Sequence, residues 1–183
     1  MATRVAKYFI ALVPEGALQE DATAFKEEMR DLFNIKYALK SPAHITLKMP
    51  FSYNELKEER LVSKLEKFFA SYSPFTLELK GFDHFGKRVI FIALRPSDIL
   101  NSLQEALGNF CKLELKLVKE LSDRAFHPHM TIAFKDIKAK NFDQYWACFK
   151  NKRFQAHYPV NDTALLKRVE GRWVIVHRFI LKG

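Results

Sequence analysis

Residues 8–14 read YFIALVP and residues 90–96 read IFIALRP, so the same short stretch occurs twice in the chain. Each copy is an apolar run of strand length that ends at a proline, which is typical of a buried β-strand. Apolar residues at helical spacing follow each proline, over residues 18–32 in the first copy and 99–110 in the second. The sequence therefore predicts an internal duplication, with an offset of 82 residues between Phe9 and Phe91.

The duplication extends well beyond this strand and helix. A His-x-Thr motif follows each helical stretch, as PAHITL at residues 42–47 and PHMTI at residues 128–132, with an offset of 85 residues between the two histidines. Each half continues with a second helix-like stretch (55–69 and 142–150), a strand (75–79 and 154–158), and a glycine-containing turn that leads to a closing strand. The order of elements is therefore the same in both halves.

From this order we predict one α+β domain over residues 1–183, with lobe-equivalent halves at about residues 5–85 and 88–181. Several connections are short turns, so we expect two mainly antiparallel sheets. The strand that closes one half also opens the next, which predicts terminal strands shared between the lobes. A pseudo-twofold duplication of this kind places the sheets around a central cleft, with helices on the outside.

Composition narrows the possible functions. The chain has 183 residues, 48 % of them hydrophobic, which is enough for one folded core. Its formal charge of +9 favours polyanionic partners such as nucleic acid. No apolar run is long enough to cross a membrane and no secretory signal is recognisable. We therefore expect a cytoplasmic protein, monomeric and without membrane contact.

The two motifs contain the candidate catalytic residues. Because side chains alternate along a strand, His44, Thr46 and Lys48 share one face of the first motif strand. By the same alternation, one face of the second motif strand presents His127, His129 and Thr131. If the duplication is structural, its axis turns these polar faces toward each other across the cleft. One histidine and one threonine then lie on each wall.

Paired histidines suit phosphodiester chemistry. A neutral imidazole can accept a proton from an attacking hydroxyl, and an imidazolium can protonate the leaving oxygen on the opposite side of phosphorus. We therefore predict that His44 and His129 are catalytic. The hydroxyls of Thr46 and Thr131 can donate to the non-bridging phosphate oxygens, where charge accumulates in the transition state. With six His and six Thr in the chain, chance accounts for roughly 0.2 His-x-Thr motifs, and two are present.

Simpler interpretations remain for several residues. A single strand histidine is usually structural, and most strand threonines are ordinary β-branched residues. His127 is a further candidate for the cleft, although the His-Pro-His string could also reflect an extended entry to the strand imposed by Pro128. Lys48 is a candidate for the same reason as Thr46, or else a solvated cation. No cysteine or third clustered histidine completes a zinc site, so we predict neither metal nor cofactor.

Four segments (residues 8–14, 44–47, 126–131 and 173–181) resemble the two-histidine phosphoesterase superfamily. Its bacterial branch comprises proteins known as 2′-5′ RNA ligases or RNA 2′,3′-cyclic phosphodiesterases. The resemblance covers nearly the whole chain. It implies a bilobal fold, metal-independent hydrolysis of 2′,3′-cyclic phosphates to 2′-phosphates, and in some members reversible 2′-5′ ligation. It also implies the catalytic and phosphate-binding roles for the two histidines and the two threonines.

One departure from the family pattern leaves the substrate open. The first motif continues as KMPF at residues 48–51, whereas typical cyclic phosphodiesterases continue with a Phe-Leu-Gly-like segment. The leading hypothesis is a phosphodiesterase for RNA ends or cyclic nucleotides, with His129 as base and His44 as acid, roles that pseudo-symmetry makes interchangeable. The alternatives are an RNA- or nucleotide-binding module without significant turnover and a phosphodiesterase for a small non-RNA cyclic phosphate.

Overall fold

The structure is a computed structural model that describes residues 4–118 and 125–183. Its strands are β1 (Val5–Leu12), β2 (Ile45–Asn54), β3 (Phe75–Phe85), β4 (Val89–Leu94), β5 (His129–Phe134), β6 (Gln155–Val160), β7 (Asp162–Val169) and β8 (Arg172–Ile180). Its α-helices are α1 (Ala17–Phe33), α2 (Glu58–Phe69), α3 (Asp98–Glu114) and α5 (Phe142–Ala147). The short 3-10 helices are η1 (Tyr37–Lys40), η2 (Glu55–Lys57) and η3 (Ala139–Asn141).

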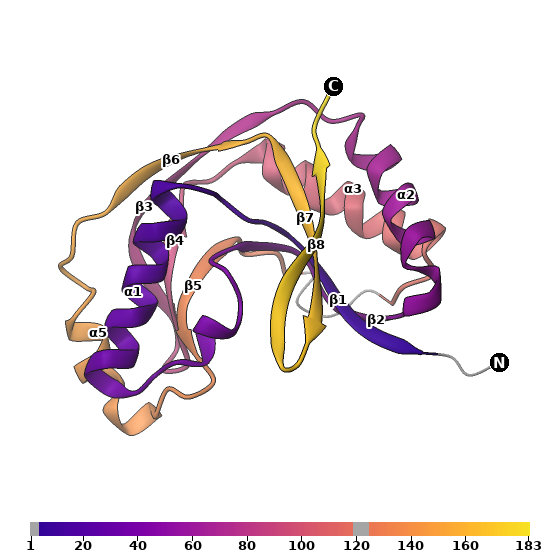
Figure 1. Cartoon of the computed structure of the whole chain (residues 1–183). Coiled ribbons are helices and arrows are strands. Elements are labelled where there is room, and N and C mark those ends of the chain that lie inside the picture. Colours follow the sequence, from indigo (N-terminus) through magenta and orange to yellow (C-terminus); the bar gives the residue numbers. More distant parts are fainter. Residues whose placement is uncertain (1–3, 119–124) are drawn as a thin grey trace.

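The strands form a single sheet in the order β6-β3-β4-β5-β2-β1-β7-β8 (Figure 1). Every neighbouring pair is antiparallel. This confirms the predicted α+β class with mainly antiparallel pairing. The described strands form one sheet, so the division into two sheets stays a prediction; four strands lie on each side of the junction where β2 meets β5. Each half of the sheet contains strands from both repeats of the sequence. Strand β3 from the first repeat pairs with β4 and β6, while β7 from the second repeat pairs with β1.

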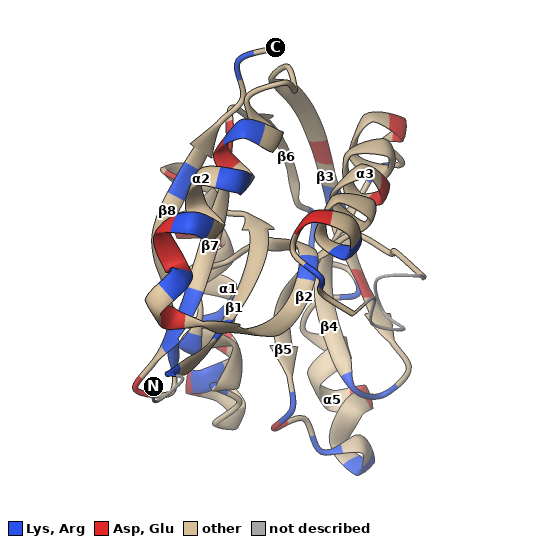
Figure 2. Ribbon diagram, turned by 90° about the vertical axis from the view of Figure 1, so that its right-hand side faces the viewer, with Lys and Arg blue, Asp and Glu red and all other residues tan. Residues whose placement is uncertain are grey.

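The helices cross from one half of the sheet to the other. Helix α1 follows β1 in the chain but packs on β5, and α3 follows β4 but packs on β2. Each half is thus covered by a helix that starts in the other, so the halves are interlocked by connectivity as well as by the sheet. Helix α2 contains both acidic and basic residues, seen as red and blue segments of its ribbon (Figure 2). No helix in the described ranges is long and apolar enough to span a membrane.

From Tyr8 to Leu12, strand β1 is buried on both faces, as the apolar sequence of this part predicts. One face contributes Tyr8, Ile10 and Leu12 to the main core beneath the helices. Its opposite face contributes Phe9, Ala11 and Val13 to a smaller apolar cluster, which β7 and Trp173 of β8 complete. The sheet therefore has apolar packing on the side away from the main core too, next to the residues of the first motif.

Candidate active site

The two motifs meet where the halves of the sheet join. Ile45 of β2 pairs with Met130 of β5, and both side chains are fully buried in the main core. Because antiparallel register runs in opposite directions along the two strands, His44 lies beside Thr131 and Thr46 beside His129. These four side chains share the face opposite the core. The histidines are diagonal neighbours, a relationship that generally separates residues by about 7–8 Å.

Both imidazoles are held by the same local hydrogen bond. The Nδ1 of His44 lies 2.7 Å from the carbonyl oxygen of Pro42, and the Nδ1 of His129 lies 2.7 Å from that of His127. A carbonyl oxygen only accepts, so Nδ1 must carry the proton in each ring. The lone pair of the neutral ring is then on Nε2. The duplicated motif therefore presents two Nε2 atoms in the same tautomeric state.

Aromatic rings pack against both histidines in an equivalent way. Phe9 lies 4.9 Å from His44 between ring centroids, and Phe91, the same position of the repeat, lies 5.0 Å from His129. A second ring backs each phenylalanine: Trp173 meets Phe9 edge-on at 4.7 Å, and Phe85 lies 4.4 Å from Phe91. These rings shield the imidazoles from water on one side, which disfavours the cationic form.

Burial lowers the pKa of both histidines. For His44 it lowers the pKa to about 4, with smaller contributions from the charges of Lys26 and His129, while the hydrogen bond to Pro42 acts in the opposite direction. Burial also lowers the pKa of His129, while the hydrogen bond to the His127 carbonyl acts in the opposite direction and the charge of His127 adds a smaller lowering. In the free protein at neutral pH both rings are therefore neutral. An anion bound between them favours protonation of one ring.

Helix α1 fixes the backbone that precedes His44. The side chain of Gln19 accepts from the amide of Ala43 at 2.7 Å and donates to its carbonyl at 2.9 Å. About two turns further along the helix, the Nζ of Lys26 donates to the carbonyls of Ala38 and Ser41 at 3.1 and 3.0 Å. Lys26 is only 2 % exposed, and burial lowers its pKa to about 8. The approach to the first motif is thus held at three residues of its backbone.

The two weaker candidates occupy different places. His127 is exposed, packs edge-on against Phe85 at 5.0 Å, and lines the same cavity as Thr46 and His129. Lys48 is 2 % exposed, donates to the carbonyl of Val118 at 3.3 Å, and does not line that cavity among the described residues. The cause is an irregularity in the pairing of β2 with β1, after which Leu47 and Lys48 are both buried. Strict alternation, on which the Lys48 prediction rested, ends there.

The cavity beside His129 has a volume of about 300 Å³, which lies at the small end of the range for ligand sites. Most of its lining is apolar. Among the described residues, the lining consists of Thr46, Leu47, Met49, Phe85, Gln104, Ala125, Phe126, His127 and His129. Gln104 of α3 is 6 % exposed and was missed by the sequence analysis. A signal for it exists, since Gln104 follows Gln19 at an offset of 85 residues, the same offset that separates the two histidines.

Within residues 4–118 and 125–183, no three His, Cys, Asp or Glu side chains lie close enough together to hold a metal ion. Where β2 meets β5, the described residues bring together two imidazoles that can transfer protons and two threonine hydroxyls that can donate hydrogen bonds.

Comparison with known proteins identifies relatives of this chain. The family model described as the 2′-5′ RNA ligase superfamily matches residues 14–172. A Bacillus pumilus (strain SAFR-032) protein named "Putative phosphoesterase" is 28 % identical over 178 residues, covering 96 % of this chain and 97 % of that protein. Escherichia coli LigT in apo form has a similar fold, with a TM-score of 0.67 and 17 % identity over 99 % of this chain and 100 % of LigT. TT0787 of Thermus thermophilus gives a TM-score of 0.69 and 18 % identity, covering 97 % and 98 % of the two chains.

Proposed function

The chain belongs to the 2′-5′ RNA ligase superfamily, and on this premise we propose that it is a metal-independent phosphodiesterase that opens 2′,3′-cyclic phosphates to 2′-phosphates. The observation that carries the proposal is the matched pair of imidazoles. Each has its Nδ1 committed to a backbone carbonyl and its Nε2 left for proton transfer. An acid and a base on two sides of one phosphate are what in-line attack at phosphorus requires.

In the proposed reaction, the oxygen of a water molecule attacks phosphorus and the bond from phosphorus to the 3′ oxygen breaks. One Nε2 takes the proton of the water, and the other imidazolium gives its proton to the departing 3′ oxygen. The hydroxyls of Thr46 and Thr131 donate to the non-bridging oxygens, whose negative charge increases in the transition state. Each turnover leaves the two rings with exchanged protons, which solvent restores.

The pKa values favour an assignment opposite to the one expected from the sequence. A general base must be neutral at the working pH, and His44, with a pKa of about 4, meets this requirement most securely. His129 lies beside the cavity that would hold the nucleoside, where it can protonate the leaving oxygen. We therefore assign His44 as base and His129 as acid, with the bound phosphate anion raising the pKa of His129.

The physiological ligands proposed are RNA ends or cyclic nucleotides. The largely apolar cavity beside His129 offers Phe85, Phe126 and Met49 to a nucleobase or ribose. The net charge of +9 attracts phosphate-rich ligands from a distance. Solved structures of Escherichia coli LigT, whose fold this chain shares, are complexes with 3′-AMP, ATP and NADP+, which supports a nucleotide-type ligand here.

The test is incubation of the purified protein with 2′,3′-cyclic AMP in the presence of EDTA, followed by chromatography against 2′-AMP and 3′-AMP standards. The expected product is 2′-AMP alone. Formation of 3′-AMP would contradict the direction of opening, and tight binding without product would favour the nucleotide-binding module. A parallel incubation of RNA halves that carry a 2′,3′-cyclic phosphate and a 5′-hydroxyl tests reversible 2′-5′ ligation. Turnover of a non-nucleotide cyclic phosphate alone would indicate that the same mechanism acts on a small non-RNA substrate.

A further inference from the structure

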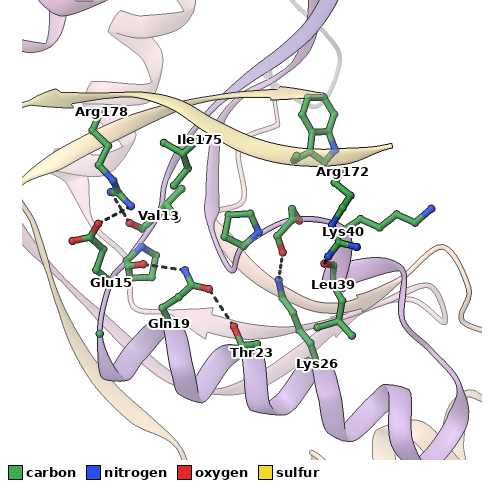
Figure 3. Close-up of a pocket in the computed structure, with 15 residues that line it drawn as sticks. Val13, Glu15, Gln19, Thr23, Lys26, Leu39, Lys40, Arg172, Ile175 and Arg178 are labelled. Carbon is green, nitrogen blue, oxygen red and sulfur yellow. Dashed lines mark hydrogen bonds and ion pairs between the residues drawn. The ribbon is translucent and has the colours of Figure 1, made fainter. Parts of the chain in front are cut away.

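A second and larger cavity lies between helix α1 and strand β8, with a volume of about 550 Å³ (Figure 3). We call it the basic pocket. Figure 3 shows Arg172 and Lys40 near each other on one side of it, Arg178 and Glu15 on the other, and Lys26 reaching up from α1 between them. The described residues that line it are Val13, Pro14, Glu15, Gly16, Gln19, Thr23, Lys26, Leu39, Lys40, Ser41, Pro42, Arg172, Trp173, Ile175 and Arg178.

The pocket carries positive charge, part of which no carboxylate of the described residues pairs with. Arg178 is paired with Asp162 at 2.8 Å and with Glu15 at 3.1 Å. In the described ranges, by contrast, no carboxylate pairs with Lys26, Lys40 or Arg172. A buried ammonium without a counter-ion is costly, so an anion at this position would offset a penalty already present in the fold.

Hydrogen-bond donors in the pocket remain available for such an anion. Lys26 has three N–H donors and uses two on the carbonyls of Ala38 and Ser41. Arg172 has five and uses one, from Nη2, on the carbonyl of Leu39 at 3.2 Å. Lys40 lies over the ring of Tyr37, with its Nζ 4.6 Å from the centroid, and is otherwise exposed to solvent. Tetrahedral oxyanions are the ligands that lysine and arginine clusters of this kind bind best.

The basic pocket adjoins the His44 side of the active site. Pro42 lines the pocket, and its carbonyl is the acceptor for the His44 ring. Trp173 also lines it and packs edge-on against Phe9, which in turn contacts His44. The apolar cavity lies on the His129 side. The reacting phosphate would thus have a largely apolar cavity on one side and a cationic one on the other.

We propose that the basic pocket binds a second phosphate group, through Arg172, Lys40 and Lys26. If that group belongs to the substrate, the enzyme prefers cyclic phosphates whose nucleotide also carries a phosphate on its 5′ side, as an RNA end or a 5′-phosphorylated nucleotide does. This preference rests on the proposed phosphodiesterase function. Phosphate binding in the pocket does not, so the two can fail separately.

The proposal is tested in two parts, a binding arm and a turnover arm. The binding arm measures the binding of inorganic pyrophosphate to the full chain by backbone amide NMR at low salt. We expect saturable shifts at the amides of Gly16 and Ser41, retained in His129→Ala, which disables the cleft but leaves the pocket. Arg172→Ala should weaken this binding by about tenfold or more, the usual effect of losing a hydrogen bond to a charged group. Lys138→Ala removes an exposed charge outside the pocket and serves as the matched control. No saturable shift at the two amides, or equal affinity in Arg172→Ala, overturns the proposal.

The turnover arm identifies the source of the phosphate. The kcat/KM for 2′,3′-cyclic AMP is compared with that for its 5′-phosphorylated form, in the wild type and in Arg172→Ala. A preference of about tenfold for the 5′-phosphorylated form, lost in Arg172→Ala but kept in Lys138→Ala, supports a phosphate of the substrate. Equal kcat/KM values in a protein that binds pyrophosphate at Gly16 and Ser41 support a separate phosphate ligand and contradict the substrate assignment. Without any turnover, the binding arm still decides whether the pocket takes phosphate.

Discussion

Ile45 and Met130 form the one register pair that joins β2 to β5, and the residues on either side of them are the four that the duplicated motif predicts to act on phosphate. The side chains of the pair lie in the core, so the alternation of both strands sends His44, Thr46, His129 and Thr131 to the opposite face. The catalytic proposal therefore depends on the backbone register at the seam, the junction between β2 and β5.

Replacing either histidine should abolish most turnover. His44→Ala and His129→Ala are each expected to lower kcat for 2′,3′-cyclic AMP by about a hundredfold to ten-thousandfold, the usual contribution of acid–base catalysis. His157→Ala, an exposed histidine on β6, is the matched control and should retain wild-type kcat. Steady-state assays by chromatography give the comparison. A catalytic-histidine variant with near-normal kcat would refute the two-histidine mechanism.

The threonines are tested by a substitution that keeps their shape. Thr46→Val and Thr131→Val each remove one hydroxyl donor to the phosphate, and each should reduce kcat by roughly a hundredfold, as loss of a transition-state donor does. Thr76→Val, at an exposed position of β3, is the control. The reduction should fall on kcat more than on KM, because the charge on the oxygens increases in the transition state. An effect on KM alone would indicate ground-state binding instead.

The low pKa of His44 predicts a pH dependence of stability. Burial holds the pKa of the folded state at about 4, below the ordinary value of 6.5, so the unfolded chain binds more protons between these values. The contribution of His44 is complete above pH 6.5 and is lost as the pH falls through 4. In urea unfolding, His44→Gln should lose less stability than the wild type between pH 7 and 4.5, by on the order of 2 kcal/mol. His157→Gln should follow the wild type, and identical losses in His44→Gln would contradict the assignment.

Gln19 should behave as a positioning residue. Gln19→Leu leaves the buried amide and carbonyl of Ala43 without their partners, at a cost of about 1–3 kcal/mol in the free energy of unfolding. Because His44 follows Ala43 directly, kcat for 2′,3′-cyclic AMP should fall by about tenfold or more while KM changes little. Gln19→Glu keeps the acceptor for the Ala43 amide and should recover part of kcat. Gln155→Leu replaces an exposed glutamine and controls for the loss of a side-chain amide. If Gln19→Leu changes the free energy of unfolding but not kcat, Gln19 has no positioning role.

Lys26 should influence the titration of His44. Its charge disfavours the His44 imidazolium, so Lys26→Met, which keeps the length of the side chain, is expected to raise the pKa of His44. Side-chain NMR of the histidine ring over a pH series measures the shift. Lys138→Met removes an exposed charge that is not among those acting on His44 and should leave this pKa unchanged. The interaction is absent if both variants titrate alike.

Local sequence patterns predicted much of this molecule because the repeat is long and its strands are regular. The period of two in residues 44–47 and 129–132 places both histidines and both threonines on one face. The pairing of Ile45 with Met130 agrees with this placement. The equivalence of Phe9 and Phe91 is visible in the duplicated strand. That each ring lies against a catalytic histidine follows only from the register between neighbouring strands, which a single sequence does not specify.

Other features depend on contacts between distant parts of the chain. Lys48 was expected on the face of Thr46, but an irregularity in the β1–β2 pairing buries it together with Leu47. Such an irregularity depends on both strands and has no marker in either alone. The basic pocket is likewise assembled from three separate segments, represented by Lys26, Lys40 and Arg172, and no motif connects them.

The seam between β2 and β5 has a thermodynamic consequence for the whole molecule. A ligand that touches both histidines bridges the two halves of the sheet at their single register pair. Such a ligand binds the folded chain and not the unfolded one, so it raises the free energy of unfolding by RT ln(1 + [L]/Kd), where [L] is the concentration of free ligand. Substrate at a hundred times its Kd then contributes about 2.7 kcal/mol. Resistance to heat or protease can accordingly report occupancy of this site in mixtures of candidate ligands, before any product is identified.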